Sequence, residues 1–472
     1  MIYLLTILSG IIYIFYSLIF FKIYQLDGYK IKSFLSSVFN FQFSFGDKNK
    51  LKFTKRMIRF IILNFVFLCV ILFAINYFIK NFWLIFLNYI VLFFLIPFVM
   101  TIAHFFICPL EGIIKKSYIL KAKKKLKKLN VIKIGITGSY GKTSTKNILK
   151  SLLEKEYKVC VTPKNFNTEM GLTKTILDVL DDHDILIAEM GARHKGDIES
   201  LAKLIKPNFG IITTIGPQHL QTFKNLQTIE ETKLELAKNL DENGIMIFNG
   251  DSKSTKKLYT IYQGEKYLSC DEDGFSYIKN LKITKDGSFF DIHINGEVIK
   301  CKTKLLGRCN INNIVTAASL AYLLGISKED LQSAIKFLEP SPHRLEMIKN
   351  GNVTIIDDSY NSNLTGASEA LEVLSKFEGK KIVVSPGIVE MGEKQSETNF
   401  KLGTMIADVA DFFIIMNETN KNYLLSGAIS HSFKRENIFF AQTRKKQKEI
   451  LNLLITNGCV VLFMNDLPDN YK

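Results

Sequence analysis

The chain has 472 residues, enough for about three domains, and 61 Lys and Arg outnumber 45 Asp and Glu to give a net charge of +16. This excess points to an anionic partner, which is nucleic acid, anionic lipid or an anionic small substrate. The seven cysteines are scattered and include no C-x-x-C pair. Their odd number argues against a disulfide framework, so we expect a reducing compartment.

Three long apolar runs, at residues 2–24, 60–77 and 82–108, occupy the start of the chain. Each approaches or exceeds the about 20 residues that cross a hydrocarbon core. The first run is too long for a signal-peptide core and lacks a basic leader, so we expect no cleavage. Buried helices of a soluble fold are the alternative, but three such runs in succession are rare there. The sequence therefore predicts a membrane domain at 1–130 with three transmembrane helices.

Lysine and arginine indicate the orientation of these helices, because cytoplasmic segments carry an excess of both. The link at 22–56 is basic, whereas the link after the second run holds little beyond Lys80. Eight lysines crowd residues 115–128, directly after the third run. We expect these lysines to contact anionic membrane lipid and not nucleic acid, and a solvated helical linker is compatible with that role. Three spans with both basic segments inside place the N-terminus outside and the rest of the chain in the cytoplasm.

A glycine-rich turn lies between a predicted strand and a predicted helix at residues 131–145, VIKIGITGSYGKTST. Backbone N–H groups and the positive end of a helix attract phosphate at such a turn. Lys142 adds a point charge, and the hydroxyl of Thr143 can reach Mg²⁺. The strict G-x-x-x-x-G-K-[ST] pattern fails, because Ile136 stands where its first glycine belongs. The strand before the turn and the helix after it still favour a phosphate loop over an ordinary loop.

Strand and helix patterns alternate up to about residue 342, which predicts a parallel sheet covered by helices. Glu189 ends one buried-strand run and His219 shortly follows another. Because ligands bind beyond the carboxyl ends of such strands, both residues are expected at the edge that carries the phosphate loop. A carboxylate and an imidazole there suit Mg²⁺ or Mn²⁺. Residues 281–303 alternate polar and apolar side chains around two turns, which predicts an antiparallel insertion.

The last part of the chain repeats the alternation, with strand patterns at 353–356, 381–384, 412–415, 438–440 and 460–463. Acidic and amide side chains follow the first of these strands, and the loop PGIVEMG at 386–392 follows the second. Both loops are expected to face the nucleotide across a cleft. The predicted fold class is α/β, with N-terminal transmembrane helices, a P-loop ATP-binding central domain at 131–342 and a Rossmann-like C-terminal domain at 343–472.

Eight segments, in order, resemble the motifs of the Mur ligase family, the ATP-dependent peptide ligases of peptidoglycan precursor synthesis. The segments are TGSYGKTS at 137–144, KNFNTEMG at 164–171, EMGARHKGDI at 189–198, IGPQHL at 215–220, TKLEL at 232–236, GRCNINN at 307–313, HRLE at 343–346 and DDSYNSN at 357–363. The first is the family's own variant of the phosphate loop. The resemblance covers about residues 131–472, two of the family's three domains, and membrane spans stand in place of the soluble domain that usually holds the UDP end of the substrate.

The resemblance implies a role for each matching residue. The ATP-binding set is Gly138, Ser139, Tyr140, Gly141, Lys142, Thr143, Ser144, Asn310 near the adenine, Arg344 on the phosphates and Asp358 on the ribose. The metal set is Thr143, Glu189, His219 and Lys233, which together hold two Mg²⁺ ions, one of them through a carbamylated Lys233. The catalytic set is Lys142, Lys233, His219 and Glu189, and the substrate set is Asn165, Asn167, Thr168, Asn361 and Asn363. From its local pattern alone, Lys233 would be an ordinary lysine on a helix surface.

DDSYNSN and PGIVEMG look most like the branch that adds D-alanyl-D-alanine to UDP-linked muramyl tripeptide, although Cys309 stands where that branch usually has histidine. The implied reaction phosphorylates the peptide carboxylate with ATP, and the amine then attacks the acyl phosphate. One alternative is a related ligase with a lipid-linked acceptor or another amino acid. A second alternative is a P-loop ATPase that powers transport through the N-terminal helices. The implied location is the bacterial inner (cytoplasmic) membrane, crossed several times, with the catalytic domains in the cytoplasm.

Overall fold

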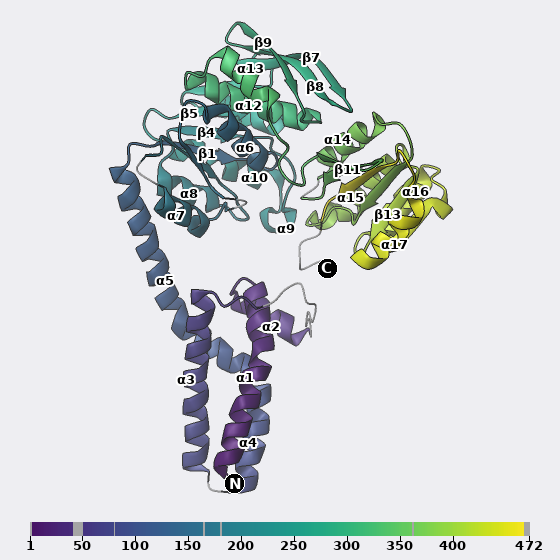
Figure 1. Cartoon of the computed structure of the whole chain (residues 1–472). Helices are drawn as coiled ribbons and strands as arrows, with labels where there is room; N and C mark the ends of the chain where they lie inside the picture. The colour runs from purple at the N-terminus through teal and green to yellow at the C-terminus, as the bar shows by residue number, and fades with distance from the viewer. Residues whose placement is uncertain are drawn as a thin grey trace. The chain divides into compact units, whose positions relative to one another are not determined.

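The computed structural model describes residues 2–40, 51–79, 81–163, 166–179, 182–360 and 363–466. Two compact units make up the chain, Met1–Leu120 and Lys121–Lys472. Figure 1 shows the first unit in purple and blue and the second in colours from blue to yellow.

The first unit is helical. Its helices are α1 (Ile2–Leu26), α2 (Ile31–Phe39), α3 (Lys55–Phe78), α4 (Phe82–Phe94) and most of α5 (Ile96–Lys128). Within it, α1, α3 and α4 run side by side (Figure 1). Among the described residues, three helices are long and apolar enough to cross a membrane, namely α1, α3 and α5. The predicted number of such helices is confirmed, although the third lies further along the chain than the predicted run at 82–108.

The third apolar run differs from its prediction as one helix over residues 82–108. It is divided at Leu95 into α4, which has 13 residues, and the start of α5. Pro97 causes the break, because it has no N–H to bond to the carbonyl one turn earlier. The N–H groups of Phe98 and Val99 bond instead to the carbonyl of Leu95, both at 3.0 Å. At 1.5 Å per residue, α4 alone is about 20 Å long and too short for a hydrocarbon core of about 30 Å.

Several polar side chains of the first unit are paired with one another. The hydroxyl of Tyr89 on α4 bonds to Thr6 of α1 at 2.8 Å and to Asn76 of α3 at 2.7 Å. Arg59 of α3 and Glu111 of α5 form an ion pair at 2.6 Å. Many large apolar side chains on these helices are exposed, while others form a core between the helices. Paired polar groups inside and apolar groups outside are what a helix bundle in lipid requires.

A nine-stranded sheet forms the first part of the second unit, in the order β2-β3-β1-β4-β5-β6-β7-β8-β9. Pairing is parallel from β2 through β7 and antiparallel from β7 through β9, as the sequence predicts. The strands are β1 (Ile132–Thr137), β2 (Val159–Val161), β3 (Ile185–Glu189), β4 (Phe209–Ile212), β5 (Ile245–Asn249), β6 (Lys266–Ser269), β7 (Ser276–Thr284), β8 (Gly287–Ile294) and β9 (Glu297–Thr303).

Helices cover both faces of this sheet, because alternate residues of a strand point in opposite directions. Ile134 and Ile136 of β1 belong to a core that α6 and α12 complete, whereas Gly135 between them faces Leu236. The helices are α6 (Lys142–Leu153), α7 (Glu169–Asp178), α8 (Asp197–Ile205), α9 (Leu220–Phe223), α10 (Leu226–Leu234), α11 (Lys253–Ile261), α12 (Arg308–Leu323) and α13 (Lys328–Lys336).

A six-stranded sheet forms the rest of the unit, in the order β10-β11-β15-β12-β13-β14, and only its β10–β11 pair is antiparallel among the described strands. Five of the strands match the predicted runs. The elements are β10 (Glu346–Asn350), β11 (Val353–Asp358), α14 (Leu364–Ser375), β12 (Lys381–Ser385), α15 (Gln395–Ala407), β13 (Phe412–Met416), α16 (Lys421–Ser430), β14 (Ile438–Ala441), α17 (Arg444–Leu454) and β15 (Val460–Met464). The edge strand β10 was not predicted, because most of it is exposed and carries no buried apolar run.

Two glycines allow α15 and α16 to cross closely. A Cβ atom added to Gly427 would lie 2.0 Å from the carbonyl oxygen of Phe400. A Cβ atom added to Gly403 would lie 2.4 Å from the carbonyl oxygen of Leu424. Both contacts are with backbone, which cannot move aside as a side chain can. The C-terminal sheet therefore depends on glycine at both positions.

We expect Gly427→Ala to lower the free energy of unfolding of the C-terminal sheet domain by about 1–3 kcal/mol, because the added methyl group forces the two helices apart. Denaturant unfolding of the full chain in detergent, followed by circular dichroism, measures this loss. Ser426→Ala on the exposed side of the same helix is the matched control and should leave the midpoint unchanged. Equal midpoints for Gly427→Ala and the control would show that the crossing is looser than described.

Candidate active site

The loop between β1 and α6 is shaped by two glycines with positive φ, +149° at Gly138 and +81° at Gly141. A Cβ atom at Gly138 would lie 1.9 Å from Thr213 Oγ1, and one at Gly141 would lie 2.4 Å from Asn313 Oδ1. Only glycine fits either position. The backbone N–H groups of Ser139 and Tyr140 bond to the carbonyl of Thr214 at 3.0 and 3.2 Å, which fixes the loop beyond the end of β4.

Lys142 folds back over this loop. Its Nζ donates to the carbonyl oxygens of Gly138 at 2.8 Å and Ser139 at 3.0 Å. Burial lowers the pKa of Lys142 to about 8, Glu189 opposes part of that shift, and the positive charge of Arg344 adds to it. Lys142, Glu189 and Arg344 therefore lie in one electrostatic neighbourhood, although they come from two different sheets.

Glu189 ends β3, is 2% exposed, and takes part in several contacts. Its Oε2 accepts from Thr143 Oγ1 at 3.0 Å and from Lys146 Nζ at 3.1 Å. The amide of Asn167 lies 3.5 Å from Oε1. A threonine hydroxyl and a carboxylate are hard oxygen donors of the type that Mg²⁺ prefers. Thr143 and Glu189 thus offer a suitable donor pair directly after the phosphate loop.

Lys146 is a site residue that the sequence analysis did not identify. It is 1% exposed and also donates to the carbonyl of Thr162 at 2.8 Å. It follows Lys142 by four residues, so the two share one face of α6. This four-residue spacing was the feature of the sequence from which Lys146 could have been predicted as a site residue. Lys146 provides the charge that a buried Glu189 needs, since an unpaired carboxylate in this position would be strongly destabilising.

Lys233 lies near the end of α10 and is 2% exposed, so it is not the surface lysine that its local pattern indicates. Burial lowers its pKa well below the usual value, and the positive charge of Lys142 lowers it further. Glu235, two residues on, accepts from the backbone N–H groups of Gly196 at 2.8 Å and Glu199 at 3.0 Å. The environment of Lys233 therefore favours the uncharged amine.

His219 follows β4, as expected, and its contact is with the C-terminal domain. Its Nδ1 pairs with Oε2 of Glu390, which lies in the loop after β12. The hydrogen bond from His219 is the main reason why the pKa of Glu390 is below its ordinary value. The structure thus brings the PGIVEMG loop to His219, a pairing that the sequence did not predict.

Arg344 and Asp358 lie at the start of the C-terminal domain. The Arg344 guanidinium stacks 4.4 Å from the centre of the Tyr360 ring, and burial lowers its pKa. Burial raises the pKa of Asp358 to about 7, although Arg344 opposes that shift. Asp358 Oδ1 accepts from the backbone N–H of Leu345 at 3.2 Å.

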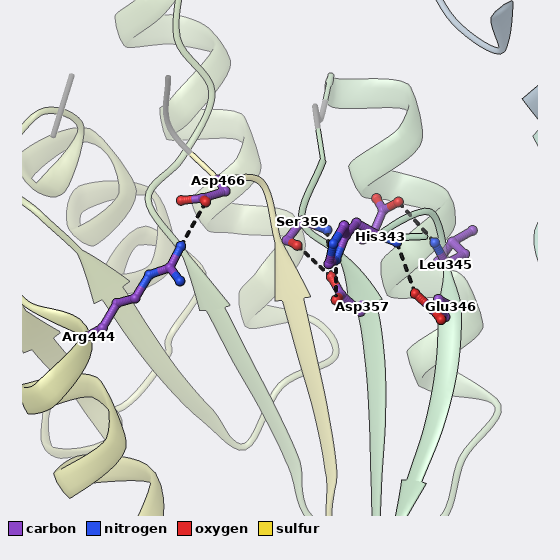
Figure 2. Close-up of polar contacts among 8 residues, drawn as sticks. His343, Leu345, Glu346, Asp357, Ser359, Arg444 and Asp466 are labelled. Atoms are coloured by element: carbon purple, nitrogen blue, oxygen red, sulfur yellow. Dashed lines mark hydrogen bonds and ion pairs between the residues drawn. The ribbon is translucent and has the colours of Figure 1, made fainter. Parts of the chain in front are cut away.

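Beside them lies a group of polar side chains that the sequence analysis did not assign. Figure 2 shows His343 between Asp357 and Glu346, with Ser359 bonded to Asp357. His343 Nδ1 lies 2.7 Å from Asp357 Oδ2, and the backbone N–H of His343 donates to Glu346 Oε2 at 3.0 Å. One ligand atom from each of His343, Glu346 and Asp357 lies within 4.8 Å of the others.

The remaining predicted residues are placed as follows. Ser144 and Asn310 are buried, and the Asn310 amide donates to the carbonyl of Leu306 at 2.8 Å. Thr168 and Asn363 cap α7 and α14 through bonds to the N–H groups of Gly171 at 3.4 Å and Gly366 at 3.0 Å. Asn165 and Asn361 lie outside the described residues.

The model of the Mur ligase middle domain matches residues 136–321, and that of the Mur ligase, glutamate ligase domain matches residues 343–465. The UDP-N-acetylmuramoyl-tripeptide--D-alanyl-D-alanine ligase of Bacillus subtilis is 29% identical over 346 residues, which are 72% of this chain and 74% of the relative. The enzyme of the same name from Buchnera aphidicola is 30% identical over 69% of this chain and 72% of the relative.

Solved structures agree with these matches. The MurF ligase of Thermotoga maritima, in complex with ADP, superposes with a TM-score of 0.67 at 28% identity, covering 75% of this chain and 80% of that chain. MurF of Acinetobacter baumannii, at 22% identity and a TM-score of 0.68, shares the fold across 75% of this chain and 77% of that chain. Two family models in the expected order, together with a relative at 30% identity that is covered over 72% of its length, establish that this chain belongs to the Mur ligase family.

Proposed function

We propose that this chain is an ATP-dependent ligase that joins D-alanyl-D-alanine to UDP-MurNAc-tripeptide in peptidoglycan precursor synthesis. Relatives with that activity in their name match 72% and 69% of this chain at 29% and 30% identity. The observation that carries the proposal is electrostatic. The positive charge of Arg344 in the C-terminal domain adds to the lowering of the pKa of Lys142 on the phosphate loop, so the two domains supply charge to one site. A phosphoryl group transferred there would meet cations from both sides.

The nucleotide binds on the loop from Gly138 to Ser144, with Lys142 against its phosphates. Asn310 lies at the adenine, Arg344 at the γ-phosphate and Asp358 at the ribose. Support comes from the Thermotoga maritima neighbour, which was solved with ADP. The Lys142 ammonium group is hydrogen-bonded to the loop carbonyls and exchanges these bonds for a phosphate when the nucleotide binds.

Two Mg²⁺ ions fit the donors present, with Thr143, Glu189, His219 and a carbamylated Lys233 as ligands. The oxygens of Thr143 and Glu189 are 3.0 Å apart, and Lys146 balances the charge of Glu189. An uncharged amine adds to CO₂, so the lowered pKa of Lys233 favours the carbamate, and nearby Lys142 stabilises its negative charge. When bound, the metal offsets charge on the transferring phosphoryl group.

The reaction proceeds in two steps. A carboxylate oxygen of the tripeptide attacks the γ-phosphorus of ATP, and the bond from that phosphorus to the β-phosphate oxygen breaks, which releases ADP. The amine of D-alanyl-D-alanine then attacks the acyl carbon, loses a proton, and expels phosphate. Lys142 and Arg344 stabilise the phosphoryl oxygens in both steps. Asn165, Asn167, Thr168, Asn361 and Asn363 position the two substrates.

The membrane unit holds this chemistry at the inner face of the bacterial cytoplasmic membrane, within a domain plan of 1–130, 131–342 and 343–472. The three long apolar helices are compatible with several crossings of a bilayer, and the basic end of α5 suits anionic lipid. Because the chain is attached to the membrane, a lipid-linked muramyl peptide is a second candidate acceptor.

A product assay tests the proposal. We expect the full chain in detergent to release phosphate from ATP only when UDP-MurNAc-tripeptide and D-alanyl-D-alanine are both present, with the pentapeptide product detected by mass spectrometry. Lys142→Ala should lower the rate by at least about 100-fold through loss of phosphoryl stabilisation, with membrane insertion unchanged. Steady ATP hydrolysis without either substrate would contradict the ligase and favour a transport ATPase. Product from the lipid-linked peptide alone would reassign the acceptor.

Nucleotide binding should take up protons near pH 8. Phosphate charge beside Lys142 raises its pKa from about 8 toward the ordinary value, so a group that is half protonated when free becomes fully protonated. We expect up to about half a proton at pH 8 and almost none at pH 6, where Lys142 is already charged. Calorimetry of ADP binding in two buffers of different ionisation enthalpy measures this uptake. Persistence of the uptake in Lys142→Met would assign it to another group.

Carbamylation of Lys233 has a direct spectroscopic test. We expect a ¹³C carbamate signal after equilibration with ¹³C-bicarbonate and loss of that signal in Lys233→Arg, because arginine stays charged and cannot form it. The ligase rate should fall by about 100-fold in the same variant. Lys238→Arg, at an exposed position five residues further on, is the matched control. A signal that survives in Lys233→Arg would place the carbamate elsewhere.

A further inference from the structure

We propose that Glu390 is a positioning residue that fixes the imidazole of His219 from the opposite domain, so that Nδ1 is engaged by the carboxylate and Nε2 is left to a divalent metal ion. The inference rests on the proposed function, in which His219 is a metal ligand, and it adds a residue for which that proposal gives no role. Metal-binding histidines usually donate their second ring N–H to a carboxylate, which sets both the tautomer and the orientation of the ring.

The pair joins two domains. His219 follows β4 in the first sheet and Glu390 follows β12 in the second, 171 residues further along the chain. The two side chains are 21% and 19% exposed, so the contact is largely shielded from water. A hydrogen bond to a carboxylate that is shielded from water is stronger and less easily screened by salt than one on the open surface.

Both partners are held on unusual backbone. His219 has φ of +51° and Glu390 has φ of +63°, a left-handed region that non-glycine residues seldom adopt. Such conformations persist only where the surroundings enforce them, and they concentrate at functional sites.

The surroundings of Glu390 are well defined. The side-chain amide of Asn399 forms two hydrogen bonds with the backbone of Ile388. It accepts from the N–H at 2.7 Å and donates to the carbonyl at 2.8 Å. The amide of Asn420 donates to the same carbonyl at 3.2 Å and to that of Pro386 at 3.1 Å. The loop that presents Glu390 is thus anchored by two buried asparagines.

The segment before His219 is anchored to the phosphate loop. Ser139 Oγ donates to the carbonyl of Gly216 at 2.9 Å, and the Tyr140 hydroxyl donates to the carbonyl of Pro217. Glu390 therefore contacts a histidine whose own loop is tied to the nucleotide site. The metal ligand reaches its best orientation only while the C-terminal domain is in place.

Binding of Mn²⁺ to the full chain in detergent, with ADP present and free Mn²⁺ counted by electron paramagnetic resonance, tests the inference without catalysis. We expect Glu390→Ala to raise the Kd for Mn²⁺ by about 10-fold, the lower end of the range for loss of such a partner. Glu390→Gln should fall between Ala and wild type, because its amide oxygen still accepts from Nδ1. In a His219→Ala background, Glu390→Ala should add little, since the two changes remove the same interaction.

Two control variants define the alternatives. Asp408→Ala breaks the exposed His431–Asp408 pair, of the same chemistry at 2.8 Å but away from the site, and should leave the Kd for Mn²⁺ unchanged. Glu369→Ala breaks a second contact between the domains, in which Glu369 accepts from the Cys309 backbone N–H at 2.8 Å. Weakening by Glu369→Ala as large as that by Glu390→Ala would mean that only domain closure matters and would overturn the inference.

Kinetics separate the remaining outcomes. In Glu390→Ala we expect the Mg²⁺ concentration for half-maximal rate to rise while the KM for D-alanyl-D-alanine stays unchanged. A higher KM for the dipeptide with normal Mn²⁺ binding would make Glu390 an amine-binding residue and would overturn the inference. Weaker Mn²⁺ binding in Glu390→Ala, combined with a wild-type chain that ligates nothing, would retain the inference and refute the proposed function.

Discussion

Charge balance around one buried carboxylate governs the structure of this site. Lys146 forms an ion pair with Glu189. The negative charge of Glu189 raises the pKa of both Lys142 and Arg344. The positive charge of Lys142 in turn lowers the pKa of Lys233. Burial lowers the pKa values of Lys142, Lys233 and Arg344, and nearby carboxylates offset that effect only in part, so the site retains a demand for anions. A polyphosphate, a carbamate and a carboxylate substrate would each meet part of that demand. Bound anions would therefore complete the charge balance of the site.

The same principle explains why the basic groups come from separate parts of the fold. Lys142 and Lys146 occupy one face of α6, while Arg344 comes from the other sheet and stacks on Tyr360. If all the cations lay on one element, their mutual repulsion would act in the unfolded chain and in every folded state. Contributing Arg344 from a second domain places its charge near the loop only when the two sheets are together. Anion binding and domain contact thus favour one another.

Local patterns predicted much of the molecule, and they failed where distant segments meet. The strand, turn and helix around Gly138 and Lys142 were predictable, because glycine torsion angles and periodicity are local properties. The burial of Lys233 and the pairing of Lys146 with Glu189 were not, since both depend on which helix face meets the sheet. The contact between His219 and Glu390 depends on how two separate sheets dock. The break at Leu95 could have been predicted, because Pro97 removes a hydrogen bond from an otherwise continuous helix.

The docking contact at Cys309 uses the backbone as well as the side chain. Glu369 accepts two bonds there, from the backbone N–H at 2.8 Å and from Sγ at 2.9 Å. Burial raises the pKa of Cys309, so the thiol keeps its proton and remains a donor. The backbone bond does not depend on which residue occupies the position, and it lies in the first turn of α12, where the helix dipole favours a carboxylate. Glu369 and Glu390 thus hold the domains together through different groups, one at a helix terminus and one at an imidazole, and only the second is expected to influence a metal ion.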